Sequence, residues 1–185
     1  RSAITRAWLR QAPGIAVVEA DPAQVATADA SWTATPGIAC TAMTADCLPV
    51  LFCNRAGTRV AAAHAGWRGL ANGVLEATLD SLAVPTDEIL AWLGPAIGPQ
   101  AFEVGPEVRE AFIAQLPEAV KAFAASPNAG KFLADIYQLA RLRLAVRGVT
   151  AVYGGGLCTV TDPRFFSYRR NPRTGRFASL IWIER

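Results

Sequence analysis

The pattern of hydrophobic and polar positions changes its period several times along the chain. Residues 15–19 (IAVVE) form a short apolar run, and residues 21–37 form a turn-rich connection. Two further apolar runs, separated by a short break, lead to a turn at residues 54–57 (NRAG) and a third run at residues 59–65 (RVAAAHA). Short apolar runs bounded by turn residues are typical of β-strands and hairpins. We therefore expect strands here, the last two joined by the NRAG hairpin.

After His64 the apolar positions recur at helical spacing, which predicts an amphipathic helix from Arg68 to about Ala83. Further helices are expected over residues 106–116 and 131–147, the second because its apolar residues form a stripe. Further strands are expected at residues 89–94, near residues 149–155 and at residues 178–184, with a long loop over residues 156–176. The mixture of hairpins and crossovers predicts an α+β fold in which mixed β-sheets pack against α-helices.

Composition narrows the class of protein. A chain of 185 residues, 52% of them hydrophobic, is long enough for one sizeable core, so a single domain over residues 1–185 is expected. No apolar stretch approaches the roughly 20 residues that cross a bilayer, and the first residues lack a signal-peptide core, so we expect a soluble, cytoplasmic protein. The four cysteines have no CxxC spacing and are expected to be reduced thiols.

The charge balance favours a small ligand over nucleic acid. The formal net charge is +3, and the basic residues gather mainly at residues 141–147 and 168–176. Binding to a duplex needs a broad basic face, whereas this distribution suits one small anion. We expect neither a nucleic-acid nor a membrane partner, and the sequence does not fix the oligomeric state.

Candidate chemistry is concentrated on three loops, at residues 44–49 (TADCLP), 64–69 (HAGWRG) and 158–170. The only histidine, His64, lies between a strand and a helix N-terminus, a junction that favours anions. Cys47 and His64 lie on strands expected to be neighbours through the NRAG hairpin, which would allow the two side chains to meet. Such a pair is either a thiolate activated by an imidazole, two ligands of a zinc-like metal, or two packed residues without chemistry.

Aromatic and basic residues near these loops suggest a ligand that is both planar and anionic. Trp67, with Phe165 or Phe166, would stack on a planar base, although aromatic residues in such chains are more often part of the core. Four arginines are candidates to bind phosphate or carboxylate, unless they are only solvated surface charges: Arg68, Arg169, Arg170 and Arg176. Asp46, next to Cys47, is either an acid/base or supporting group, or a turn-capping residue.

Several blocks of the sequence together resemble one protein family. These blocks are ADASWT (28–33), TADCLPVLF (44–52), AHAGWRGL (63–70), GPAIGPQAFEVG (94–105), GLCT (156–159) and RFFSYRRNPRTGRFASLIWI (164–183). With them the chain, from about Leu9 onward, resembles the YfiH family, also called the laccase-domain or multicopper polyphenol oxidoreductase family. The resemblance implies a compact α+β fold, and it implies that the full family domain has N-terminal residues that precede Arg1.

The resemblance also implies a metal site, because members bind a zinc-like ion, or copper in the older description, through one cysteine and two histidines. Cys47 and His64 match two of these ligands. The third belongs to a QVHG block, and the matching residues 11–14 here are QAPG, which places Pro13 at the histidine position. Catalytic zinc sites usually have three protein ligands. Either the site is degraded, or a carboxylate or a thiol supplies the third ligand.

The activity implied by the resemblance is that of a purine nucleoside phosphorylase. Such members cleave adenosine, inosine and methylthioadenosine with phosphate, and they also deaminate adenosine. We expect Arg68, with Arg169 or Arg170, to hold phosphate and the aromatic residues to hold the purine. Deamination uses a metal-activated water, so it should suffer more than phosphorolysis from the proline.

Other functions remain open at this point. A cysteine hydrolase or peptidoglycan-editing enzyme would use Cys47 and His64, the first without a metal. Copper-dependent phenol oxidation is disfavoured because a multicopper centre needs many histidines and this chain has one. A catalytically silent nucleoside-binding protein is the non-enzyme alternative, and Pro13 is its best argument.

Overall fold

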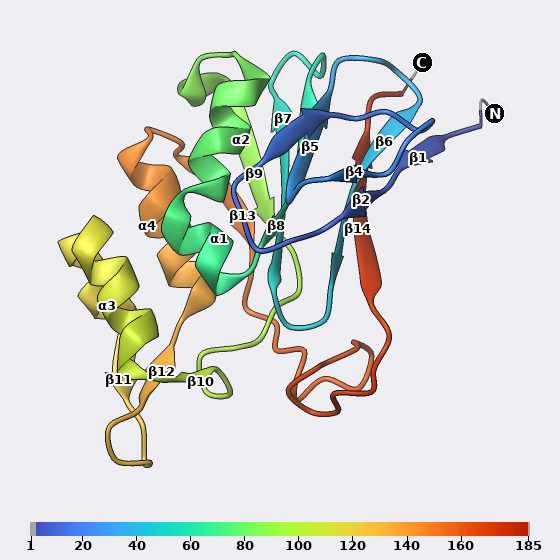
Figure 1. Cartoon of the computed structure of the whole chain (residues 1–185). Helices are drawn as coiled ribbons and strands as arrows, with labels where there is room; N and C mark the ends of the chain where they lie inside the picture. Colours follow the sequence, from blue (N-terminus) through green and yellow to red (C-terminus); the bar gives the residue numbers. More distant parts are fainter. Residues whose placement is uncertain (1–2, 185) are drawn as a thin grey trace.

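A computed structural model describes residues 3–184, and they form three layers (Figure 1). The middle layer is a mixed sheet in which β5, β8, β7 and β9 are antiparallel neighbours, while β3 and β13 add in parallel at its two edges. Its strands, in spatial order, are β13 (Ala151–Gly154), β9 (Ile89–Leu93), β7 (Leu48–Asn54), β8 (Val60–Ala65), β5 (Ala30–Thr33) and β3 (Val17–Glu19).

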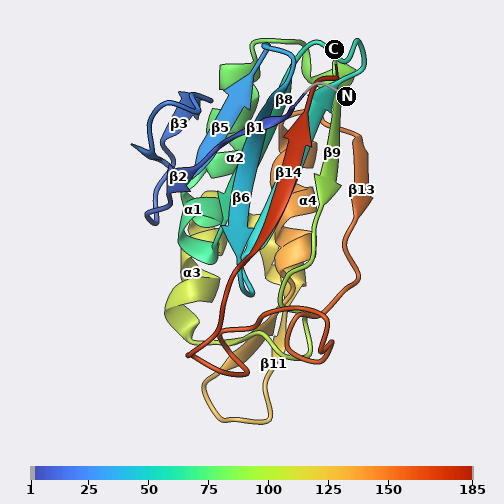
Figure 2. The same cartoon turned by 90° about the vertical axis from the view of Figure 1, so that its right-hand side faces the viewer.

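A three-stranded sheet covers one face of the middle layer. Figure 2 shows its strands in front of the larger sheet, with the helices behind. β6 (Ile38–Thr44) is the central strand, paired in parallel with β1 (Thr5–Ala7) and antiparallel with β14 (Phe177–Trp182). The first and last strands of the chain therefore meet on β6.

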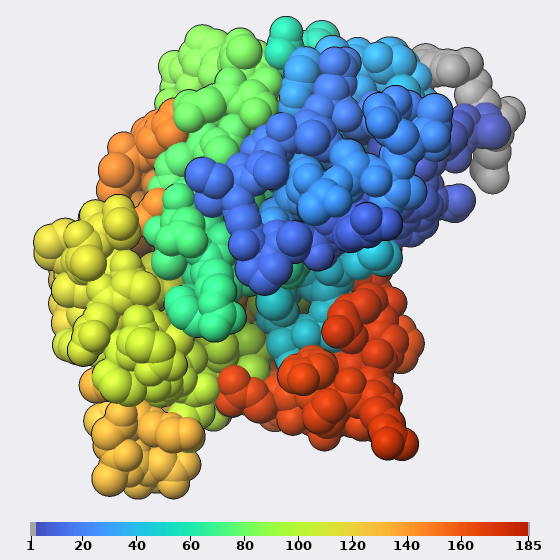
Figure 3. All heavy atoms as spheres, viewed as in Figure 1, coloured from blue at the N-terminus to red at the C-terminus, as the bar shows by residue number. Residues whose placement is uncertain are grey.

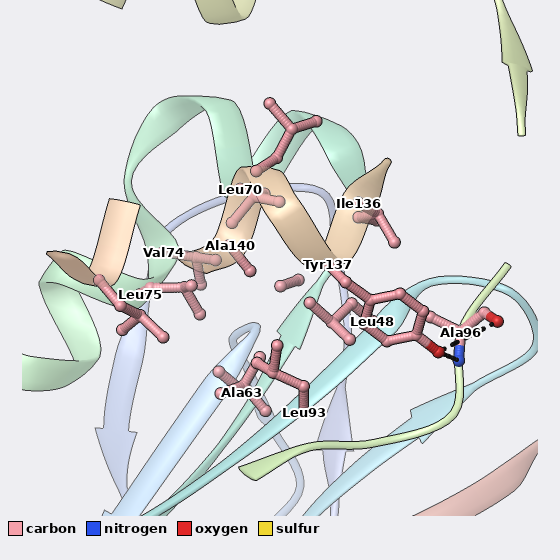
Figure 4. Close-up of a cluster of buried hydrophobic side chains, with 14 of the residues drawn as sticks. Leu48, Ala63, Leu70, Val74, Leu75, Leu93, Ala96, Ile136, Tyr137 and Ala140 are labelled. Atoms are coloured by element: carbon pink, nitrogen blue, oxygen red, sulfur yellow. Dashed lines mark hydrogen bonds between the residues drawn. The ribbon is translucent and has the colours of Figure 1, made fainter. Parts of the chain in front are cut away.

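The helices cover the other face and enclose the larger core. They are α1 (Trp67–Asn72), α2 (Val74–Leu82), α3 (Pro106–Gln115) and α4 (Ile136–Val146). Figure 4 shows Leu70, Val74 and Leu75 from α1 and α2 beside Leu48 and Leu93 of the sheet, and all five side chains are almost fully buried. This apolar burial is the main favourable contribution to folding.

Alternation along β8 decides where His64 points. Its odd-numbered alanines pack under the helices, whereas Val60 and Ala62 pack between the two sheets. Successive side chains of a strand face opposite sides, so His64 belongs with Val60 and Ala62. Its imidazole therefore lies at the end of the space between the two sheets.

Smaller elements complete the fold. A two-stranded parallel sheet pairs β2 (Leu9–Arg10) with β4 (Ala26–Thr27), and an antiparallel sheet has the order β10 (Glu103–Val104), β12 (Phe132–Ala134) and β11 (Phe123–Ala125). Two 3-10 helices span Thr86–Glu88 and Pro117–Ala122. Within residues 3–184 there is no helix long and apolar enough to cross a membrane.

The predicted α+β class and most of the strands are confirmed, including the hairpin between β7 and β8. Two helix predictions were wrong in extent. The helix expected over residues 68–83 is two helices, because the backbone of Gly73, with a φ of +104°, is left-handed and interrupts the helix between α1 and α2. The helix expected over residues 131–147 begins only at Ile136, and residues 132–134 form a strand.

The connection expected over residues 21–37 was also wrong, because it contains β4 and β5. β5 is an inner strand, paired with both β3 and β8. It places Asp29, the residue just before it, beside the end of β8, and this neighbour of His64 is important for the site described next.

Candidate active site

A cavity of about 640 Å³ opens where the ends of the two main sheets meet the long C-terminal loop. In Figure 3 the C-terminal loop (red) and the α1 segment (green) stand on either side of a hollow. A volume of this size suits a small organic ligand. The lining residues come from six parts of the chain: Leu9, Arg10, Gln11, Pro13, Met43, Thr44, Ala45, Asp46, Cys47, His64, Trp67, Ile97, Phe102, Ile136, Tyr168, Arg169 and Arg176.

Asp46 fixes the turn between β6 and β7 and joins it to the C-terminal loop. Its backbone φ is +94°, a left-handed conformation that is costly for a non-glycine residue. Its carboxylate accepts hydrogen bonds from the Thr159 hydroxyl and from the Arg169 N–H, both at 2.6 Å. Both carboxylate oxygens are thus engaged, which favours a positioning role over the acid/base role considered from the sequence.

Cys47 and His64 lie together, as their neighbouring strands led us to expect. A methyl group added at Gly66 would lie 3.2 Å from the Cys47 Sγ and 3.6 Å from the His64 Nε2, so both atoms approach the same point. The pairing of Pro49 with His64 across β7 and β8 sets this approach. The sulfur and the nitrogen therefore face one shared space beside the cavity.

Asp29 orients His64, and it was missed from the sequence. Its Oδ1 lies 2.9 Å from the His64 Nδ1, and its side chain is almost completely buried. A carboxylate only accepts hydrogen bonds, so Nδ1 carries the hydrogen and Nε2 faces Cys47. The ADASWT block contains Asp29, but the only signal for its partner is the pairing of β5 with β8, which sequence spacing does not show.

The Cys47 thiol is a poor nucleophile in this environment. Burial, together with the nearby charges of Asp46 and Asp29, raises the pKa of Cys47 to about 11, although Arg176 opposes the shift. Catalytic cysteines instead have a lowered pKa, because the thiolate is the reactive form. This environment disfavours the cysteine hydrolase alternative.

Pro13 stands beside Cys47 and His64, where the family resemblance implies a third metal ligand. All three residues line both the main cavity and a smaller one of about 100 Å³ next to it. Proline offers no side-chain donor. Over residues 3–184 there is no group of three histidine, cysteine or acidic side chains arranged to hold a metal ion, so the donors present do not fit the implied three-ligand centre.

The aromatic residues of the cavity differ in part from those expected. Trp67 lines the cavity as predicted, together with Phe102 and Tyr168. Phe165 instead packs against Phe177, with ring centroids 5.5 Å apart. Phe166 also lies outside the lining and is in contact with Gly175. Neither predicted phenylalanine is placed to stack on a ligand in this cavity.

The arginines also divide between the cavity and the scaffold. Arg169 and Arg176 line the main cavity, and Arg10, which was missed from the sequence, lies with them. The Arg170 guanidinium is outside, because it donates to backbone carbonyls of the C-terminal loop: those of Thr159, Val160, Asp162 and Phe165. Arg170 therefore holds the loop together and does not point at a ligand.

Arg68 lies at the small cavity and not at the main one. Its Cζ is 4.4 Å from the centroid of the Trp67 ring, so the guanidinium stacks on the aromatic ring that both cavities share. Helix α1 spans only six residues, so its dipole contributes less at this point than a long helix would.

Known proteins resemble this chain over nearly its whole length. A family model described as multi-copper polyphenol oxidoreductase laccase matches residues 2–184. A purine nucleoside phosphorylase of Pseudomonas aeruginosa is 70% identical over 96% of this chain and 74% of its own length. The purine nucleoside phosphorylase YfiH of Escherichia coli is 59% identical over 95% of this chain and 73% of its own length.

Solved structures agree with the fold. A crystal structure of a Neisseria meningitidis protein matches with a TM-score of 0.94 and 54% identity, covering 98% of this chain and 76% of that one. The crystal structure of a Bacillus licheniformis hypothetical protein YfiH matches with a TM-score of 0.89 and 26% identity, covering 97% and 74%. The arrangement of sheets and helices is therefore common to these proteins.

Proposed function

The chain belongs to the multi-copper polyphenol oxidoreductase laccase family, and we propose that it is a purine nucleoside phosphorylase-like enzyme that cleaves adenosine, inosine or methylthioadenosine with inorganic phosphate. Two similar relatives carry the name purine nucleoside phosphorylase. The observation that carries the proposal is one cavity that combines an aromatic wall, three arginines and an oriented histidine. That combination suits a planar base together with an anion.

The proposed reaction is a displacement at the anomeric carbon. A phosphate oxygen forms a bond to C1′ of the ribose while the bond from C1′ to the purine nitrogen breaks. The electron pair leaves with the purine, which takes up a proton, and the products are ribose 1-phosphate and the free base. Negative charge therefore leaves the phosphate and develops on the purine, so the site must hold an anion and supply a proton.

The residues of the cavity supply these functions in the proposal. Arg169 and Arg176 hold the phosphate through the guanidinium N–H groups that remain after Arg169 donates from Nη1 and Nη2 to the Glu103 carbonyl and Arg176 donates from Nη1 to the Thr174 and Gly175 carbonyls. Trp67 and Tyr168 enclose the purine ring. His64 takes the proton of the attacking hydrogen phosphate at Nε2 and gives it to the leaving purine, so the imidazole ends the reaction as it began. Asp29 does not touch the substrate and keeps the imidazole in the required orientation.

The test uses Arg176→Gln, with Arg173→Gln as a matched control because Arg173 is exposed on the same loop and does not line the cavity. Loss of a charge-assisted hydrogen bond costs about 1.5–3 kcal/mol, or roughly 10- to 100-fold in phosphate affinity. We expect the KM for phosphate to rise by that factor in Arg176→Gln only. The same phosphate KM in both variants and the parent would contradict the proposed phosphate site.

The same assay separates an enzyme from a silent binding protein. Inosine that binds without release of hypoxanthine, at any phosphate concentration, is the result expected of a catalytically silent member of the family. That result would refute phosphorolysis while leaving the fold and the cavity unaffected.

A further inference from the structure

Two donors converge beside the main cavity without a third. The Cys47 Sγ and the His64 Nε2 approach the same point near Gly66, and they are the donor types that zinc prefers. A catalytic zinc site, however, usually has three protein ligands. The remaining candidates for a third ligand are the nearby carboxylates and thiols.

The nearby carboxylates are already committed to other partners. Asp29 binds the far side of the same imidazole, through Nδ1. Asp46 accepts hydrogen bonds on both carboxylate oxygens, from the Thr159 hydroxyl and the Arg169 N–H. Within residues 3–184 no histidine, cysteine or acidic side chains form a group of three arranged to hold a metal ion, so neither carboxylate is placed as a third ligand beside Cys47 and His64.

A substitute thiol or imidazole is not at hand either. The Cys158 Sγ accepts a hydrogen bond from the Gly98 N–H at 3.3 Å and does not line either cavity next to His64. His64 is the only histidine in the sequence. The sequence left open that a carboxylate or a thiol replaces the third metal ligand, and the described residues place neither group there.

Pro13 occupies the side of the site from which a third donor would come. Within residues 9–14, Pro13 is the one residue that lines both cavities, as Cys47, His64 and Trp67 also do. A histidine at this position would replace a residue that lines the same two cavities as Cys47 and His64.

We infer that Cys47 and His64 form a two-donor site that does not retain zinc, and that Pro13→His alone creates a site that does. Even changes to residues around metal ligands cost about 10- to 100-fold in affinity, so an absent ligand costs at least about tenfold. The inference concerns metal binding and does not depend on the proposed reaction.

One consequence does rest on the proposed function. Hydrolytic deamination of a purine, as zinc deaminases perform it, needs a metal-activated water, whereas the displacement by phosphate described above uses only side chains of this chain. We therefore expect this protein to release free base from adenosine with phosphate, and to release ammonia far more slowly.

The decisive measurement is zinc binding by the purified full chain. The parent protein, Pro13→His, Pro13→Ala and the double variant Pro13→His/Cys47→Ser are stripped with a chelator and titrated with zinc, with bound metal measured by elemental analysis. We expect only Pro13→His to bind about one zinc ion per chain and to gain thermal stability with zinc. The parent should bind at least about tenfold more weakly.

Two results would overturn the inference. One is a parent protein that holds zinc as tightly as Pro13→His does. The other is a folded Pro13→His variant, checked by circular dichroism, that gains no zinc. If Pro13→His does not fold, the titration of the parent decides alone, because tight binding refutes the inference and weak binding supports it. Neither result depends on turnover, so a failure of the phosphorylase proposal remains distinguishable.

Discussion

Replacing Asp46 separates a positioning residue from an acid/base residue. Asp46→Ala removes the carboxylate that accepts from the Thr159 hydroxyl and from the Arg169 N–H. Hydrogen bonds to charged groups contribute about 1.5–3 kcal/mol each, so we expect a loss of roughly 3–6 kcal/mol in the free energy of unfolding. Thr159 is fully buried, so water cannot replace its lost acceptor.

Asp46→Asn is the matched change because it keeps the shape of the side chain. The amide oxygen still accepts from the Arg169 N–H, and the amide nitrogen donates to the Thr159 oxygen. We expect a loss of only about 1–2 kcal/mol, mainly from the missing charge. Urea unfolding followed by tryptophan fluorescence measures both variants. Asp80→Asn serves as a control, because the pair of Asp80 with Arg147 is exposed and contributes about 0–1 kcal/mol.

Activity then tests the role directly. General acid/base catalysis contributes typically about 10²–10⁴-fold, whereas a positioning residue that keeps its hydrogen bonds contributes far less. We expect Asp46→Asn to retain kcat within about tenfold of the parent. A natively stable Asp46→Asn variant with a loss of more than about a hundredfold would refute the positioning role.

Three further predictions follow from the packing and the thiols. Burial raises the pKa of Cys47 to about 11, whereas hydrogen bonds from Thr161 and Gly98 outweigh partial burial and lower the pKa of Cys158. Iodoacetamide at pH 8 should therefore modify Cys158 well before Cys47. Peptide mass spectrometry measures the order of labelling, and faster labelling of Cys47 would contradict the prediction. Gly69→Ala places a Cβ 2.9 Å from the Gly14 carbonyl oxygen, so it should destabilise the protein by about 1–3 kcal/mol in urea, and an unchanged unfolding midpoint would argue against the close approach of α1 to the segment around Pro13. Tyr137→Phe leaves the Ala96 N–H and the Leu157 carbonyl without the hydroxyl that bonds both, at a cost of about 1–3 kcal/mol. Burial also raises the pKa of Tyr137 to about 12, so the unfolded chain loses this proton at a lower pH than the folded protein does. The free energy of unfolding of the parent should therefore fall between pH 10 and 12 through this group. A Tyr137→Phe variant whose free energy of unfolding falls equally over that pH range would refute this contribution.

The sequence predicted the parts of the fold that depend on local pattern. The hairpin of β7 and β8 followed from two apolar runs around a turn, and it was enough to bring Cys47 and His64 together. The strand at residues 132–134 was missed because Phe132 and Leu133 also continue the apolar stripe of the helix that follows. Which structure forms there depends on pairing with β10 and β11, which lie elsewhere in the sequence.

The site was predictable where residues are neighbours on one hairpin, and not where it depends on long-range pairing. Asp29 reaches His64 only because β5 lies next to β8. The choice among arginines was equally unpredictable. Both Arg170 and Arg176 donate to carbonyls of the C-terminal loop, but only Arg176 lines the cavity. Local composition indicated the chemistry, and tertiary contacts selected the residues.

The central claim is that this cavity cleaves purine nucleosides with phosphate. The most direct test incubates the purified protein with inosine, with and without phosphate, and follows hypoxanthine by chromatography and ribose 1-phosphate by phosphorus NMR. The account predicts that both products appear in equal amounts and only when phosphate is present, without added metal. Release of hypoxanthine that does not depend on phosphate, or no release at all, would contradict it.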